Sequence, residues 1–140
     1  MIVHRHQLRV RYGETDQMGY LYYGHYPAYY EVARAEMIRS LGYTYRKLEE
    51  ELNIMMPVMS LNMRYVRPAK YDDLLTIETT VRKAPDLFMT FHHEVFNENG
   101  DLLNGGSVKL GFIEASSRES CSAPSILVDI INQQIESQIQ

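Results

Sequence analysis

The sequence predicts an α+β fold in which an antiparallel β-sheet wraps around one long α-helix. Residues 24–41 carry large apolar side chains at three- and four-residue spacing, which is typical of a helix with one buried face. Five other segments alternate apolar with polar residues, as half-buried strands do. The 140 residues, 45% of them hydrophobic, are enough for one core, so we expect a single domain over residues 1–140.

The first strand is expected over residues 2–12, where even positions are apolar, aromatic or histidine and most odd positions carry arginine or glutamine. The long helix follows a connection rich in glycine and tyrosine. Pro27 is compatible with its first turn, and Gly42 ends it. A shorter helix is expected over residues 45–52.

Four more strands are expected over residues 59–65, 75–81, 87–95 and 106–112. Asp72 and Asp73 form a turn before the second of these, and Asn99 and Gly100 form a hairpin turn before the last. The last strands therefore indicate an antiparallel meander. A closing helix is expected from Pro124, because the apolar residues that follow fall on one stripe.

Charge and composition exclude several classes of protein. The formal net charge of −4 provides no basic excess for nucleic acid, which is not an expected partner. No uncharged apolar run reaches the ~18 residues that cross a bilayer, so neither a membrane anchor nor an export signal is expected. Cys121 is the only cysteine, which suits a reducing compartment, and we expect a cytoplasmic protein.

Neither a metal nor a cofactor is expected. His4 and His6 share a strand face, and His92 and His93 are adjacent, but no third ligand stands at a recognisable spacing. The glycine-rich phosphate loop, the dinucleotide fingerprint, the nucleophile elbow and the zinc-protease helix motif are also missing. Nucleotide hydrolases, Rossmann enzymes, serine hydrolases and metalloproteases are thereby disfavoured.

Three segments of the sequence carry recognisable motifs. Residues 12–26 read Y-G-E-T-D-Q-M-G-Y-L-Y-Y-G-H-Y, with Asp16 ahead of a glycine and a helix-opening aromatic segment. Residues 31–36 read E-V-A-R-A-E within the long helix, and residues 68–75 read P-A-K-Y-D-D-L-L at a turn between two strands. Together they resemble the signature, the central helix and the inter-strand turn of the 4-hydroxybenzoyl-CoA thioesterase family, and the resemblance extends to about residue 113. It implies a hotdog fold, an acyl-CoA substrate, and an active site between the subunits of a homodimer or homotetramer.

Thioester hydrolysis needs a group that attacks the carbonyl carbon or activates water, and donors for the oxygen on which negative charge grows. Asp16 can supply the first. The resemblance implies that it acts as a nucleophile through a mixed anhydride or as a general base, and the sequence leaves both open. Backbone N–H groups near Tyr23 and Gly24, at the helix start, can supply the second. The family motif points to the amide of Tyr23, and Gly24 would let a ligand approach the backbone.

Four further residues are candidates for substrate binding. His25 follows Gly24 and is either a thioester contact or an ordinary residue of a helix start. Met59 belongs to a methionine-rich stretch that could line an acyl groove or simply pack in the core. Arg82 and Lys83 are candidates for the phosphates of coenzyme A, because an anionic ligand needs local positive charge and the resemblance implies a basic cluster in this connection.

Glu14 and Glu31 are rival carboxylates for catalysis. We interpret Glu14 as a solvated loop charge. We interpret Glu31 as a helix residue in an ion pair with Arg34 or Lys47.

Two alternatives to hydrolysis belong to other classes. A hotdog domain could bind acyl thioesters without cleaving them, or could be a dehydratase or hydratase that acts on the acyl chain. Asp16 before a helix start would be unexplained in a pure binding protein. A dehydratase would be expected to place a histidine and an acid across the acyl chain, and no such pair is recognisable. The sequence therefore favours a thioester hydrolase.

Overall fold

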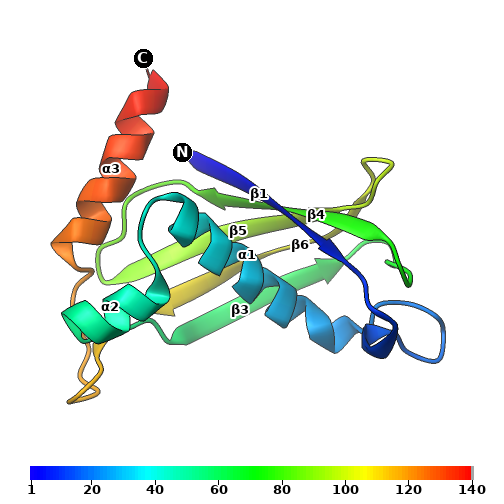
Figure 1. Cartoon of the computed structure of the whole chain (residues 1–140), viewed down its shortest axis with the longest axis horizontal. Coiled ribbons are helices and arrows are strands. Elements are labelled where there is room, and N and C mark those ends of the chain that lie inside the picture. The colour runs from blue at the N-terminus through cyan, green and yellow to red at the C-terminus, as the bar shows by residue number, and fades with distance from the viewer. Residues whose placement is uncertain (140) are drawn as a thin grey trace.

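The computed structural model describes residues 1–139 as an antiparallel sheet with a long helix packed across one face (Figure 1). The five strands lie in the order β1-β4-β5-β6-β3. Their bounds are β1 Ile2–Arg9, β3 Val58–Tyr65, β4 Leu74–Val81, β5 Phe88–Phe96 and β6 Leu102–Gly111. The helices are α1 Tyr26–Ser40, α2 Tyr45–Leu52 and α3 Ser125–Ile139. The predicted α+β architecture is confirmed.

Most predicted elements are present within a few residues of their expected bounds. The first strand ends at Arg9, and a 3-10 turn, η1, follows at Tyr12–Glu14. The long helix begins at Tyr26 because the residues before it form a second 3-10 turn, η2, at Tyr23–His25. A pair of two-residue strands, β2 Ile54–Met55 and β7 Ile113–Glu114, was not predicted. Two residues are too few to show an alternating pattern.

The core lies between α1 and the concave side of the sheet, and α1 packs most closely against β1 and β4. Alternate residues of β4 and β5 are buried against the helix, among them Leu75, Ile77 and Phe91. Tyr30 and Met37 of α1 are fully buried on the helix side of this core. Each such side chain contributes roughly 1.5–3 kcal/mol by leaving water. This packing fixes where the start of α1 lies relative to the sheet.

A buried polar cluster crosses this core. The hydroxyl of Tyr30 donates a hydrogen bond to the side-chain oxygen of Asn104. His93 is 1% exposed, its Nδ1 lies 3.0 Å from Thr79 Oγ1, and its ring lies 4.3 Å from that of Tyr30. Burial, together with the nearby cation of Arg34, lowers the pKa of His93 to about 3. His93 is therefore neutral in the folded protein at neutral pH.

We expect His93 to make the protein sensitive to acid. The unfolded chain takes up a proton here below about pH 6.5, whereas the folded chain does not. The free energy of unfolding should fall by about 1.4 kcal/mol per pH unit between about pH 6 and pH 4 because of this one group. In His93→Phe, the free energy of unfolding, measured by urea titration at each pH, should depend less steeply on pH over this range. The difference in slope should be the contribution of about one proton. Thr79→Val, which keeps the imidazole, should retain the wild-type slope, and an unchanged slope in His93→Phe would contradict the assignment.

Strand β3 forms an open edge of the sheet. It pairs with β6 on one side and with nothing in the described chain on the other. Its residues are mostly exposed, including the apolar Val58, Met59 and Leu61. The predicted alternation is present in its sequence, but no element of residues 1–139 covers its apolar side chains. An open apolar edge is a site for pairing with another chain.

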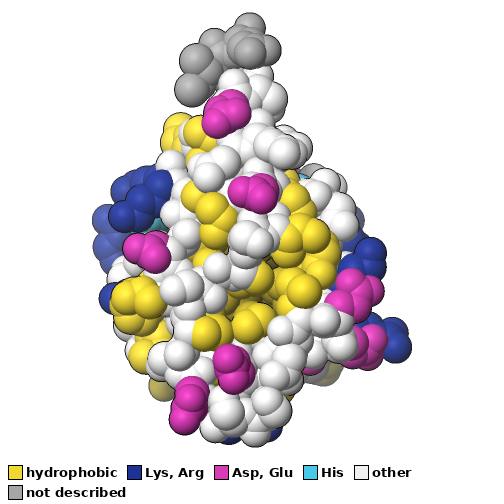
Figure 2. Space-filling view, turned by 90° about the vertical axis from the view of Figure 1, so that its left-hand side faces the viewer, with side chains coloured by type: hydrophobic (Ala, Val, Ile, Leu, Met, Phe, Trp, Pro, Cys, Tyr) yellow, Lys and Arg dark blue, Asp and Glu magenta, His cyan; other side chains and the backbone are white. Residues whose placement is uncertain are grey.

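The end of the molecule that carries α2 and α3 displays a group of apolar side chains (Figure 2). Leu127 and Ile131 of α3 are buried against the body of the protein, while Ile126 is exposed. None of the described helices is long and apolar enough to cross a membrane.

Candidate active site

The loop before α1 holds the carboxylate of Asp16 in a fixed orientation. Its Oδ1 accepts hydrogen bonds from the backbone N–H groups of Met18, at 2.9 Å, and Tyr20, at 3.2 Å. The N–H of Asp16 donates to the carbonyl of Tyr20 at 2.8 Å. Gly19 closes this turn with a φ of +81°, which favours glycine. Oδ2 accepts no hydrogen bond from residues 1–139 and is left for a substrate or a water molecule.

Asp16 and Tyr23 line the same pocket, which has a volume of about 270 Å³. It lies where the Asp16 loop, the start of α1 and the end of β3 meet. Its remaining walls are mostly apolar or aromatic and are formed by Met18, Tyr20, Leu21, Tyr26, Tyr65, Val66, Arg67 and Pro68. The structure thus brings together the two residues that the sequence predicts to be catalytic. A carboxylate in a largely apolar concavity is a typical feature of a small-molecule site.

The turn before α1 leaves two backbone donors without acceptors. Within residues 1–139, neither Tyr23 nor Gly24 donates a backbone hydrogen bond, whereas His25 donates to the carbonyl of Tyr22 at 2.9 Å. Tyr65 of β3 donates its hydroxyl to the carbonyl of Tyr23 at 3.1 Å and so ties this turn to the open edge strand. Unpaired N–H groups at a helix start can stabilise an oxyanion.

Gly24 and His25 differ in their relation to this site. A Cβ at Gly24 would lie 2.6 Å from Cε2 of Tyr22, so a side chain there would displace that ring. His25 packs its ring edge-on against Tyr22, with 5.6 Å between the ring centres. It is half-buried and does not line the Asp16 pocket. The structure therefore places His25 beside the site but not in its wall.

The interpretation of Glu14 as a solvated charge is wrong. Its side chain is 13% exposed and accepts hydrogen bonds from the hydroxyl of Tyr29, at 2.7 Å, and from the backbone and guanidinium of Arg11, at 2.9 and 3.1 Å. Burial alone would raise the pKa of Glu14, but these hydrogen bonds together lower it below its ordinary value. Glu14 also accepts the N–H of Tyr22 through its carbonyl at 2.9 Å. It therefore joins the Asp16 loop to α1.

Glu31 does not form the predicted ion pair. No side-chain contact within 4.0 Å joins it to Arg34 or Lys47 in residues 1–139, and the side chain is exposed. It lines a different pocket, on the flank of α1 that faces α2. Neither Glu14 nor Glu31 therefore competes with Asp16 for a place in the Asp16 pocket.

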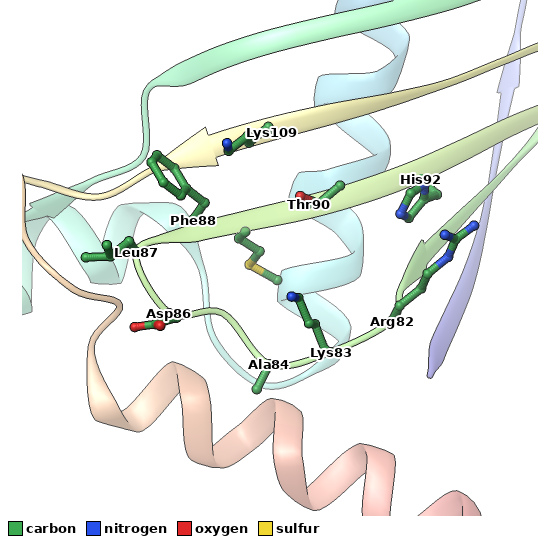
Figure 3. A pocket seen from close by; sticks show the side chains of 10 residues that line it. Arg82, Lys83, Ala84, Asp86, Leu87, Phe88, Thr90, His92 and Lys109 are labelled. Carbon is green, nitrogen blue, oxygen red and sulfur yellow. The ribbon is translucent and has the colours of Figure 1, made fainter.

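Arg82 and Lys83 line a second pocket, of about 750 Å³, on the face of the sheet away from α1 (Figure 3). His92 of β5 and Lys109 of β6 also line it, and Lys109 lies 4.0 Å from the ring centre of Phe88. The one acid in its wall is Asp86. The predicted phosphate-binding residues therefore share a basic pocket, but this pocket is separate from that of Asp16 within one chain.

Met59 lines a further small pocket of about 120 Å³ near the beginning of β3. Phe88 and Cys121 lie in the same wall. Tyr65, at the other end of β3, lines the Asp16 pocket. One chain therefore does not bring Met59 to Asp16. Among the residues that the structure describes, no group of three or more His, Cys, Asp or Glu side chains is arranged to bind a metal.

A sheet wrapped around one long helix is the hotdog architecture, and an oriented carboxylate beside unpaired amides at the helix start is compatible with thioester hydrolysis. Comparison with known proteins agrees. The family model of the thioesterase superfamily matches residues 18–104. The acyl-CoA thioesterase YbgC of Haemophilus influenzae is 31% identical over 117 residues, which cover 84% of this chain and 85% of that protein.

Solved structures give the same result. A DHNA-CoA thioesterase from Staphylococcus aureus superposes with a TM-score of 0.88 and 32% identity, over 99% of this chain and 93% of that one. A mutant 4-hydroxybenzoyl-CoA thioesterase in complex with 4-hydroxybenzoyl-CoA has the same fold, with a TM-score of 0.83 and 23% identity over 92% of this chain and 98% of that one. The chain therefore belongs to the thioesterase superfamily, and it is a thioester hydrolase.

Proposed function

We propose that this enzyme hydrolyses acyl-CoA thioesters to a free acid and coenzyme A, with Asp16 as its catalytic carboxylate. The proposal rests on the hydrogen bonding and position of that carboxylate. Backbone N–H groups orient Oδ1, and Oδ2 has no partner in the described chain, beside a pocket that can accept a small acyl group. The names of the relatives, acyl-CoA thioesterase among them, support the same substrate class.

Asp16 can act by either of two routes. As a nucleophile, its Oδ2 attacks the thioester carbonyl and the C–S bond breaks, with coenzyme A leaving as the thiolate. Water then hydrolyses the mixed anhydride, which releases the free acid, restores the Asp16 carboxylate and supplies the proton that the thiolate takes up. As a general base, Asp16 takes a proton from water, whose oxygen attacks the same carbon while the thiolate leaves and is protonated. Negative charge grows on the carbonyl oxygen in both routes, and the amides of Tyr23 and Gly24 would stabilise it. Both routes end in the acid and the thiol of coenzyme A.

A homodimer joined through β3 would complete the site. A two-fold axis perpendicular to the sheet keeps both copies of α1 on one face and makes the two β3 strands run antiparallel. The Tyr65 end of β3, at the Asp16 pocket, then lies beside the Val58 end of the second copy. Met59 lies at that same end of β3 and would be brought toward the Asp16 pocket of the second copy, whereas the basic pocket remains on the face of the sheet away from α1.

We propose that Arg82, Lys83 and Lys109 bind the phosphates of coenzyme A. Replacing Arg82 and Lys83 together with alanine should raise the KM for an acyl-CoA roughly tenfold and change kcat little, because the phosphates lie far from the reacting bond. Steady-state kinetics at low and high salt would measure the effect. The corresponding acyl-pantetheine, which lacks the nucleotide, serves as the control substrate. A rise in KM of equal size for both substrates would exclude a role in phosphate binding.

The proposed function is tested by free-thiol release from a panel of acyl-CoAs with short, long and aromatic acyl groups. We expect release from at least one of them by the purified wild-type protein. Binding of the whole panel without release would instead support the alternative of a non-catalytic acyl-thioester-binding protein. Release of water from a 3-hydroxyacyl-CoA, with the thioester intact, would support a dehydratase.

A further inference from the structure

Glu14 holds its carboxylate in a network of hydrogen bonds that the proposed chemistry does not use. The side chain is 13% exposed, and its Oε1 accepts the hydroxyl of Tyr29 at 2.7 Å and the backbone N–H of Arg11 at 2.9 Å. Its Oε2 accepts the guanidinium of Arg11 at 3.1 Å. Neither Glu14 nor Tyr29 lines the Asp16 pocket. Any role of Glu14 in the reaction must therefore act through other residues.

Tyr29 is a well-suited donor for this carboxylate. It lies in the first turn of α1 and is 4% exposed. Burial, together with the neighbouring carboxylate of Glu14, raises the pKa of Tyr29, so its hydroxyl stays protonated at neutral pH. Although burial alone would raise the pKa of Glu14, its hydrogen bonds lower it below the ordinary value, so the acceptor is ionised. A hydrogen bond to an ionised acceptor is roughly twice as strong as one between neutral groups.

Glu14 stands at the base of the loop that carries Asp16. Two antiparallel backbone contacts close this loop. The N–H of Tyr22 donates to the carbonyl of Glu14 at 2.9 Å, and nearer the tip the N–H of Asp16 donates to the carbonyl of Tyr20 at 2.8 Å. Asp16 lies two residues after Glu14, and Tyr23 comes directly after Tyr22. The proposed catalytic carboxylate and the proposed oxyanion donors therefore extend from the same pair of residues.

The two sides of the loop are attached to the protein in different ways. The side that leads to α1 is tied to the connection between β3 and β4, because the N–H of Leu21 donates to the carbonyl of Ala69 at 2.8 Å. Within residues 1–139, the side that leads to Asp16 is joined to α1 by one hydrogen bond, between the carboxylate of Glu14 and Tyr29. Loss of this bond would release the Asp16 side and leave the other side attached.

We propose that Glu14 is a positioning residue, which through Tyr29 holds the carboxylate of Asp16 at the correct distance from the amides at the start of α1. This inference rests on the proposed role of Asp16 in acyl-CoA hydrolysis. The attacking group acts on the carbonyl carbon and the amides act on its oxygen, so the distance between them must match one carbonyl bond. A misplacement of about 1 Å at such a site can lower the rate about a hundredfold.

Tyr29→Phe tests the proposal, because it removes one hydroxyl and keeps the packing of the ring. We expect kcat for acyl-CoA hydrolysis to fall roughly thirtyfold and KM to change less than about threefold, because neither residue contacts the substrate. Tyr43→Phe is the matched control. Tyr43 is also buried and its hydroxyl donates to a glutamate, Glu51 at 3.4 Å, but neither of these lines the Asp16 pocket. An unchanged kcat in Tyr29→Phe, or equal losses in both variants, would overturn the proposal.

Two substitutions of Glu14 test the acceptor. Glu14→Ala removes every contact of the carboxylate and should lower kcat at least as far as Tyr29→Phe does. Glu14→Gln keeps one side-chain oxygen for the Tyr29 hydroxyl, so it should recover part of the kcat that Glu14→Ala loses. Equal kcat in these two variants would contradict the assigned contact.

A double-mutant cycle with Asp16 separates positioning from a general loss of structure. Single-turnover thiol release from an acyl-CoA is measured for Asp16→Asn with and without Tyr29→Phe. Because Glu14 acts through the Asp16 carboxylate, Tyr29→Phe should lower the residual rate of Asp16→Asn by less than about twofold. The full loss in that background would overturn the positioning role and leave the proposed reaction standing. Wild-type turnover by Asp16→Asn itself would overturn the proposed reaction, and this inference with it.

Discussion

Asp16→Asn should lower kcat for acyl-CoA hydrolysis by about a thousandfold or more, while the dissociation constant of the substrate changes by less than about tenfold. An amide can neither form the anhydride nor take a proton from water. Its side-chain oxygen can still accept the N–H groups of Met18 and Tyr20 that Oδ1 accepts in the wild type. The loop should therefore keep its shape. Single-turnover thiol release and calorimetric titration measure the two effects.

Asp73→Asn is the matched control for this substitution. Asp73 also lies in a turn and accepts a backbone N–H through its carboxylate, from Lys70 at 2.9 Å, but it does not line the Asp16 pocket. Its variant should retain kcat to within about threefold. An Asp16→Asn protein with wild-type turnover would remove Asp16 from the mechanism. Equal losses in both variants would mean that an aspartate in a turn matters for folding and not for chemistry.

The fold was predictable because its signals are local. The alternation along β4 places Leu75, Ile77 and Val81 on the buried face, and the observed burial follows it residue by residue. The turn at Asn99 and Gly100 links β5 to β6 as expected, with Gly100 at a φ of +83°. In each case neighbouring residues determine the backbone, so the pattern alone was sufficient.

The contacts that hold the site residues in place were not predictable, since the residues that make them are far apart in the sequence. Glu14 receives its hydrogen bond from Tyr29, fifteen residues later, and no spacing rule relates a loop acid to a helix tyrosine. Arg34 fits the helix pattern equally well as a solvated charge, so only its burial marks it as unusual. Such features depend on tertiary packing, which overrides local preference.

The division of the predicted site residues among pockets has a further cause. Arg82 and Lys83 were grouped with Asp16 by resemblance to enzymes whose sites lie between subunits, and Met59 was added because it belongs to a methionine-rich stretch. One chain places them in separate pockets, and a sequence pattern carries no information on where a second copy would lie.

Leu61→Lys should separate the proposed dimer and reduce activity at least a hundredfold. Leu61 is 42% exposed at the middle of β3, where a charge would be brought against its own copy across a two-fold axis. Inward charges on an edge strand prevent edge-to-edge pairing. Analytical ultracentrifugation should show the mass of one chain, 16.3 kDa, in place of a multiple of it. Activity should fall with it, because the residues of the second copy would no longer lie beside the Asp16 pocket.

Ile126→Lys is the matched control, because Ile126 on α3 is also 42% exposed and lies away from the β3 edge. It should keep both the mass and the turnover of the wild type. A wild-type protein that sediments as one chain and hydrolyses acyl-CoA at full rate would show that each site is complete in a single subunit. A Leu61→Lys monomer that loses kcat, while its Asp16 loop and free energy of unfolding are unchanged, would establish that catalysis requires the second copy. A Leu61→Lys protein that is both monomeric and inactive would thus show that pairing at the open edge of the sheet is required for the chemistry at Asp16.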